Sequence, residues 1–321
     1  MKKTLLSLIL ACFTIGSAMS QEEHIVYDLY HFNYYMINPA VAGAERCGHF
    51  MLTNRHKWIG MDGPNTQTFS YRSRPWQNVG VGGYLFRDNN GRDTYLGGQL
   101  SFAYHIPMGN RFRQAVELDQ QLSFGVSIKF NHRSFDFSDI TDPSDIALHS
   151  DSGYYPNANV GVYYTSYGFF TGLSVTNLIP TRLDMFRDNE PNAPLTGLFF
   201  IGNDFKISKN ASIEPSIMVR GNDVYGLLGD FNLKFSQNLT NDFSYYALIS
   251  YRGTADLRSA KGKTTEDYQS LGIMPMIGLR YGNWNFADGA GIDLNKLRPS
   301  NYGSHQVMVG YTLCIPTQFC R

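Results

Sequence analysis

Residues 122–130 read Leu122-Ser123-Phe124-Gly125-Val126-Ser127-Ile128-Lys129-Phe130, so every second residue is apolar and its partners are small or polar. In an extended strand, this period of two places all the apolar side chains on one face. Similar stretches, separated by turn residues, recur nearly to the C-terminus, and after residue 20 none has the unbroken apolar run of a membrane helix. The pattern predicts an all-β fold, a transmembrane antiparallel barrel with an apolar outside and a polar inside.

The first twenty residues have the pattern of a signal peptide. Lys2 and Lys3 precede an apolar stretch over residues 5–15, and Ala18-Met19-Ser20 fits the small residues before a cleavage site. The alternative is a lipoprotein signal in which Cys12 carries the lipid. We therefore expect an exported chain with three parts: a signal peptide (1–20), an N-terminal aromatic segment (21–46) and a barrel (47–321).

Composition narrows the class of protein. Lys and Arg number 27 and Asp and Glu also 27, so the chain as a whole does not have the basic character of a nucleic-acid binder. The length suits one large β-domain or two ordinary ones, and no Pro/Ser-rich linker marks a boundary. After cleavage of the signal, Cys47, Cys314 and Cys320 remain. Cys314 and Cys320 are close enough to form a small disulfide loop; the alternative is that both stay free or modified.

Fourteen strands are expected, taking about ten residues as the unit of a barrel strand. They are 49–58, 66–74, 78–87, 94–106, 119–131, 157–166, 168–177, 196–207, 211–220, 223–236, 241–252, 270–281, 283–293 and 304–314. Barrels of the outer membrane have short periplasmic turns and long external loops. The short connections 166–168, 208–210 and 281–283 fall on the predicted inner side, and the long connections 132–156, 178–195, 253–269 and 294–303 on the outer side. Two connections depart from this pattern: 107–118 is long on the inner side, and 221–222 is tight on the outer side. An even strand number places both termini in the periplasm.

Side chains that carry chemistry are scattered. None of the eight histidines forms a tight metal-ligand spacing, and no phosphate-binding glycine loop opens a helix. The Asp-rich stretch 136–145 lacks the spacing of a calcium loop. We predict no catalytic, cofactor-binding or metal-binding residues and no enzymatic activity.

The N-terminal part carries a more specific pattern. Tyr27-Asp28-Leu29-Tyr30 is followed by Ile37-Asn38-Pro39-Ala40-Val41-Ala42-Gly43 and by Arg55-His56-Lys57-Trp58-Ile59-Gly60-Met61-Asp62-Gly63-Pro64. These motifs resemble the start of the PorP/SprF family, outer-membrane proteins associated with the type IX secretion system of Bacteroidota. The likeness extends over nearly the whole mature chain, with Asn65 inserted after Pro64 as a small departure.

The resemblance implies a non-enzymatic barrel of about fourteen strands that links the outer membrane to periplasmic ring lipoproteins, anchors exported surface proteins, or both. It implies contact with type IX secretion components and with outer-membrane lipids. The alternative function is a porin or small-solute channel, because a barrel of this size can enclose an aqueous lumen.

The family motif also supplies the candidates for partner binding: Asn38, Pro39, Ala40, Gly43, Arg55, Trp58, Gly60, Asp62 and Gly63. We expect the aromatic segment to pack at the periplasmic mouth or to enter the lumen, with Asn38-Pro39 fixing its bend and Arg55 pairing with a lumen carboxylate. The alternative is that these residues only initiate barrel closure.

Overall fold

The computed structural model describes residues 28–60, 63–108, 120–136, 152–180, 193–222, 226–255, 272–294 and 302–314. Three short 3-10 helices come first: η1 (Asp28–Phe32), η2 (Tyr34–Met36) and η3 (Pro39–Val41). The strands that follow are β1 (Gly48–His56), β2 (Asn65–Trp76), β3 (Val79–Asn90), β4 (Asp93–Pro107), β5 (Gln120–Phe135), β6 (Ser152–Ser166), β7 (Phe169–Thr176), β8 (Thr196–Asn203), β9 (Phe205–Lys206), β10 (Ala211–Asn222), β11 (Gly226–Asn238), β12 (Phe243–Ala255), β13 (Gly272–Tyr281), β14 (Trp284–Asp293) and β15 (Ser304–Leu313).

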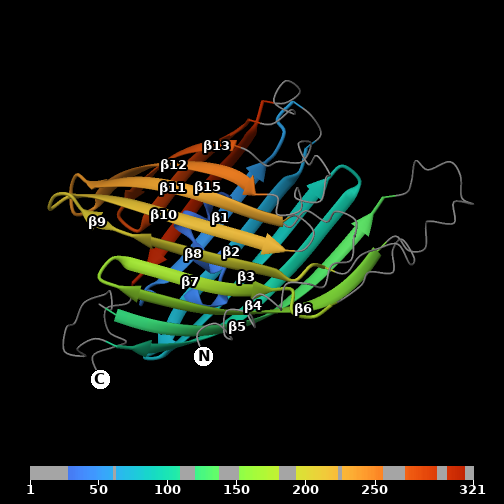
Figure 1. Ribbon diagram of the computed structural model, residues 1–321, viewed down its shortest axis with the longest axis horizontal. Coiled ribbons are helices and arrows are strands. Elements are labelled where there is room, and N and C mark those ends of the chain that lie inside the picture. The colour runs from blue at the N-terminus through green and yellow to red at the C-terminus, as the bar shows by residue number, and fades with distance from the viewer. Residues whose placement is uncertain are drawn as a thin grey trace, which may run out of the picture.

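The strands form a closed antiparallel barrel whose spatial order follows the chain. Strand β1 pairs with β2 on one side and with β15 on the other, and this last pairing closes the wall. The two residues of β9 continue β8 and pair with the same neighbour, β10, so the wall has fourteen strands. Figure 1 shows the wall running from the blue N-terminal strands through green and yellow to the red C-terminal ones. The predicted fold and all fourteen predicted strands are confirmed.

The two faces of each strand differ as the period of two predicts. On β5, Phe124, Val126 and Ile128 point outward and are about half exposed, whereas Ser123 and Ser127 point inward and are buried. The same alternation exposes Leu96, Leu100 and Phe102 on β4. An outward apolar band lets the wall lie in lipid while the backbone hydrogen bonds are satisfied between strands.

The two ends of the barrel are different. We call the end where β1 begins and β15 finishes the terminal end, because Gly48 pairs with Leu313 there. The short connections at 167–168, 207–210 and 282–283 lie at this end. The opposite end has the connection between Thr176 of β7 and Thr196 of β8. Long and short connections alternate broadly, with exceptions: the β4–β5 connection is long at the terminal end, and the β3–β4 and β10–β11 connections are short at the opposite end.

The interior is filled at the terminal half by the chain that precedes β1. Tyr30, Tyr35, Ala40 and Ala42 are at most 1% exposed and pack against lumen-facing side chains of the wall. A second apolar cluster surrounds Leu29 and is formed by Leu248, Met274, Met276, Ala287 and Met308. No helix among the described residues is long and apolar enough to cross a membrane.

Candidate functional site: the plugged lumen

Residues 28–46, here called the plug, enter the lumen and turn sharply at Asn38. The Asn38 side chain accepts a hydrogen bond from the Ala40 amide at 2.9 Å, which caps η3, and Pro39 takes the first position of that helix. The Asn38 amide group also donates to the carbonyl oxygens of Val162 and Leu173, at 2.9 and 3.3 Å. One buried side chain therefore bends the plug and attaches it to β6 and β7. Of the two expected positions, the structure shows entry into the lumen.

Wall glycines make room for this bend. A Cβ atom on Gly125 would overlap the Ala40 backbone, and one on Gly161 would overlap the Asn38 side chain. Gly80 faces the Ala42 carbonyl in the same way. Glycine within a strand suits a curved barrel wall, and at these positions it also admits the plug. Gly80 and Gly82 are two residues apart in β3, and this spacing in the sequence indicates that both lie on the same, inward face of the strand.

Aromatic side chains hold the deeper part of the plug. The Tyr30 hydroxyl accepts a hydrogen bond from Asn232 of β11 at 3.0 Å, and Tyr35 shares one with Ser101 of β4 at 3.0 Å. Ring contacts add to these bonds: the ring centroids of Phe32 and Tyr246 lie 4.8 Å apart. The plug is thus bonded to strands on several sides of the barrel, and buried tyrosines find partners as their polar tips require.

Polar side chains of β4 and β5 donate hydrogen bonds to backbone carbonyl oxygens in the C-terminal part of the plug. His105 donates from Nε2 to the Ala42 carbonyl at 2.9 Å, and its Nδ1 is hydrogen-bonded to Ser123 at 2.8 Å. Gln121 donates to the Ala44 carbonyl at 3.4 Å. Because His105, Ser123 and Gln121 are fully buried, this level of the lumen is packed.

An ion cluster lies where the plug reaches the terminal end. Arg72 donates to a Glu45 carboxylate oxygen at 3.0 Å, and His49 contacts the other oxygen at 2.6 Å. Partial enclosure of the Glu45 carboxyl acts to raise its pKa, but Arg72 and His49 outweigh this effect and hold that pKa well below its usual value. The Glu45 side chain keeps 51% of its surface accessible, so water screens this cluster.

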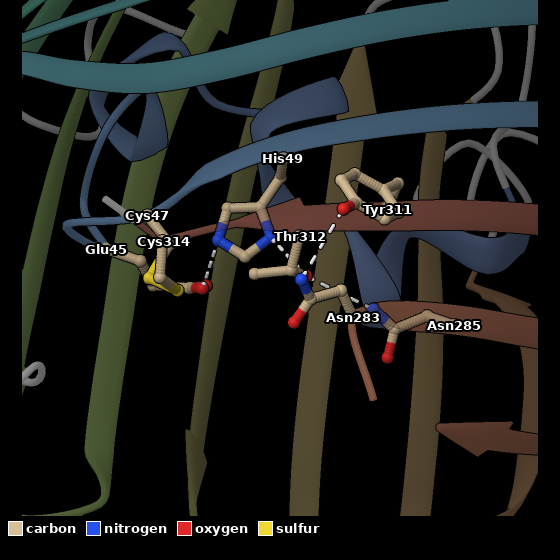
Figure 2. The surroundings of a disulfide bond; sticks show 8 residues. All are labelled: Glu45, Cys47, His49, Asn283, Asn285, Tyr311, Thr312 and Cys314. Carbon is tan, nitrogen blue, oxygen red and sulfur yellow. Dashed lines mark hydrogen bonds and ion pairs between the residues drawn. A yellow bond between two sulfur atoms is a disulfide. The ribbon is translucent and has the colours of Figure 1, made fainter. Parts of the chain in front are cut away.

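A disulfide bond links the first and last strands of the wall, next to the end of the plug. Cys47, just before β1, is bonded to Cys314, just after β15, across a sequence separation of 267 residues. Figure 2 shows His49 beside this bond, between Glu45 and Thr312 of β15. The expected pairing of Cys314 with Cys320 is therefore wrong, because closure of the wall brings Cys47 within a Cα distance of 4.4 Å of Cys314. Cys320 lies outside the described residues.

The second half of the family motif lies at the other end of the barrel. Arg55 is buried, faces the lumen and acts electrostatically on Asp88 of β3. Trp58 has a positive φ of 52°, which is rare for a residue with a side chain. Gly60 and Gly63 belong to the turn that follows, and neither has room for a side chain. A Cβ on Gly60 would meet Tyr302, and one on Gly63 would meet the Lys57 backbone. Asp62 lies outside the described residues.

The motif is therefore divided between two places. Asn38, Pro39, Ala40 and Gly43 form the bend of the plug near the terminal end, and Gly43 needs its φ of +68° and its missing side chain to pass Ser73. The turn after β1 binds the loop before β15, with the Ile59 amide donating to the Gly303 carbonyl at 3.0 Å. In the described part of the chain, no group of three acidic, histidine or cysteine side chains is placed to hold a metal.

A family model described as "Type IX secretion system membrane protein PorP/SprF" matches residues 19–311. The chain belongs to this family. It is an outer-membrane component of the type IX secretion system, and the sequence-based assignment of family and location is confirmed. Membership implies contact with other components of that system. Among curated proteins, none matches the sequence.

Solved structures share the barrel. The toluene transporter TbuX of Ralstonia pickettii is 9% identical with a TM-score of 0.51, over 87% of this chain and 92% of that one. A TodX monoaromatic hydrocarbon channel variant is 10% identical with a TM-score of 0.52, over 88% and 94%. A Pseudomonas aeruginosa FadL homologue is 10% identical with a TM-score of 0.50, over 86% and 92%. At these identities the likeness concerns the fold alone.

Proposed function

We propose that this PorP/SprF-family barrel is a closed, non-conducting scaffold of the type IX secretion system, with its terminal end toward the periplasm. The observation that carries the proposal is the plug, which fills the terminal half of the lumen and hydrogen-bonds to β4, β5, β6, β7 and β11. A solute channel needs a continuous aqueous path, whereas lumen side chains at this level are buried.

The orientation follows from the connections. Both ends of the barrel chain lie at the terminal end, and all but one of the connections there are short, the exception being β4–β5, although the β3–β4 and β10–β11 turns at the opposite end are short as well. Outer-membrane barrels place short turns in the periplasm. At that mouth the Glu45 side chain is 51% exposed and Cys314 is exposed, whereas Cys47 and most of the plug are buried. This end is the surface that we assign to periplasmic ring lipoproteins. The opposite end, with its long connections, is the side for an exported surface protein.

A clean gene deletion tests the proposal. Mass spectrometry of the cell surface, the medium and the periplasm would follow, with the intact gene restored as the control. Proteins carrying type IX export domains should disappear from outside and accumulate inside. Loss of all such proteins assigns a linking role in general secretion, and loss of one client assigns an anchoring role. Unchanged export would overturn the proposal.

The motif residues allow a finer test of the same role. Asn38→Ala removes the bend and the bonds to β6 and β7, and Arg55→Ala removes the charge beside Asp88. Normal barrel assembly with lost export would support a role for these residues in secretion. Failed assembly would show that they serve barrel closure instead.

A small-solute channel is the second candidate. What favours it is the size of the barrel, since fourteen strands can enclose an aqueous lumen. Conductance of the purified full chain in a planar bilayer separates the two functions. The plugged scaffold should give no steady current, and large steady currents would establish the channel.

A further inference from the structure

A small cavity lies between the plug and the part of the wall where β1 pairs with β15. Its lining comes from the plug and from β1, β2 and β15. The centre of a water molecule can occupy about 10 Å³ within it, and one buried water molecule needs about 10–15 Å³ of such space. Part of the lining is apolar, with Met36 from the plug and Met51 from β1, but polar side chains also contribute. The cavity is therefore large enough for a single water molecule.

Three oxygen atoms on residues of this lining are buried and have no hydrogen-bond partner in the described part of the chain. They are Oδ1 of Asn33 in the plug, Oγ1 of Thr68 in β2 and Oε1 of Gln306 in β15. The three residues are 3%, 4% and 5% exposed, so bulk water does not reach these atoms. Buried polar atoms normally have a protein or a water partner, because an unpaired one destabilises the fold. Three of them around one cavity indicate a common ligand.

The hydrogen-bonding character of the three groups matches water. Nδ2 of Asn33 donates to the Ser70 hydroxyl at 3.0 Å, which fixes the orientation of the amide group and leaves Oδ1 as an acceptor. Oε1 of Gln306 is a second acceptor, and the Thr68 hydroxyl can donate. A water molecule has two hydrogens and two lone pairs. It can donate to the Asn33 and Gln306 oxygens while it accepts from Thr68.

The composition of the lining disfavours a cation as the ligand. No carboxylate belongs to the described residues that line the cavity. The inward positions that follow Thr53 on β1 and Ser70 on β2 include two cations, Arg55 and Arg72, which are both buried. A metal ion must exchange its hydration shell for protein oxygens, and a partly apolar lining offers few of these. A neutral ligand of the size of water fits both the space and the charge.

We propose that one water molecule binds in this cavity and joins the plug to the wall through Asn33, Thr68 and Gln306. Since β1 pairs with β2 on one side and with β15 on the other, the water connects the plug to both neighbours of the first strand. It is then a fixed part of the contact between the plug and the closed wall. The site consists of lumen residues alone, so its test does not depend on the role in secretion.

The sign of one stability change tests the site. Thr68→Val replaces the hydroxyl with a methyl group. If the hydroxyl is bonded to water, the midpoint of thermal unfolding should fall by roughly 2–4 °C, the shift that one hydrogen bond gives a chain of this size. If the hydroxyl is buried without a ligand, its removal relieves an unfavourable burial and the midpoint should rise. The full chain is heated in detergent, and its folded fraction is read from migration on a gel.

Ser250→Ala is the matched control. The Ser250 hydroxyl of β12 is also buried with no hydrogen-bond partner among the described residues, but Ser250 does not line the cavity. Its substitution should leave the midpoint unchanged or raise it. An unchanged or raised midpoint for Thr68→Val, or an equal fall for both variants, would overturn the proposal. If the Thr68 variant does not fold, Gln306→Leu takes its place under the same criterion.

A high-resolution crystal structure of the full chain gives the direct observation. Electron density within about 2.6–3.2 Å of all three oxygens supports the bound water. Crystals soaked in rubidium distinguish an ion, because rubidium scatters anomalously and water does not. An anomalous signal at this position would show a cation and overturn the proposal, and so would the absence of density between the three oxygens.

Discussion

Gly125 of β5 faces the Ala40 backbone so closely that any Cβ at position 125 would occupy the space of the Ala40 amide nitrogen. The contact joins two segments that lie 85 positions apart in the sequence, and it fixes how far the plug can approach the wall. Glycine is required at position 125 because of the contact with Ala40, and not because of the backbone conformation of β5.

Gly125→Ala should therefore unseat the plug. Since overpacking typically costs about 1–3 kcal/mol, the thermal unfolding midpoint of the folded protein in detergent should fall. Gly229→Ala on β11 is the matched control, because the nearest atom to its Cβ would be 3.9 Å away. Equal effects of the two substitutions would contradict the contact, and a steady current through the Gly125 variant alone would locate the plug as the barrier.

A buried ion pair inside the lumen gives a second prediction. Arg252 of β12 donates two hydrogen bonds to Asp230 of β11, both at 2.7 Å, and Asp230 is fully buried. Asp230→Asn should cost about 3–5 kcal/mol in the free energy of unfolding, because it leaves the guanidinium without its counter-charge. Replacing both residues by Leu and Met should cost far less. A double variant as unstable as the single one would contradict this account.

The disulfide predicts a specific peptide. Proteolysis without reductant should release a fragment that links Cys47 to Cys314, and Cys47→Ser should lower the free energy of unfolding by about 2–5 kcal/mol. Reductant should reproduce that loss in the natural chain and have no effect when both cysteines are serine. Recovery of a Cys314–Cys320 peptide instead would refute the pairing.

The ion cluster at the mouth predicts an acid dependence. Arg72 and His49 hold the pKa of Glu45 below its usual value of 4.5, so its stabilising contribution is present above that value and is lost as the pH falls toward the folded-state pKa. The thermal midpoint should therefore decline on acidification below about pH 4.5. Glu45→Gln should show a shallower decline at low pH. An identical pH profile for the two proteins would rule the contribution out.

The sequence revealed the wall better than the lumen. The fourteen strands follow from a local period of two, and each can be recognised from its own residues. The bend at Asn38-Pro39 was also visible locally. The contacts of Gly125 with Ala40 and of Cys47 with Cys314 were not, because they arise only when the wall closes. The contact of Asp288 with His305, at 2.7 Å on the outer face, lies between these cases: the alternation of Asp288 with Trp284 and Phe286 indicates the outer face, but the contact itself needs the register of β14 and β15.

The bond between Cys47 and Cys314 gives the molecule the topology of a lasso. The chain from one cysteine to the other forms a covalent ring that contains the entire barrel wall, and the residues before Cys47 form a tail that passes back into the bore of that ring. A single cut in any loop of the wall would open the ring without releasing a fragment. The tail is the one described part that can leave the bore while every strand pairing stays intact.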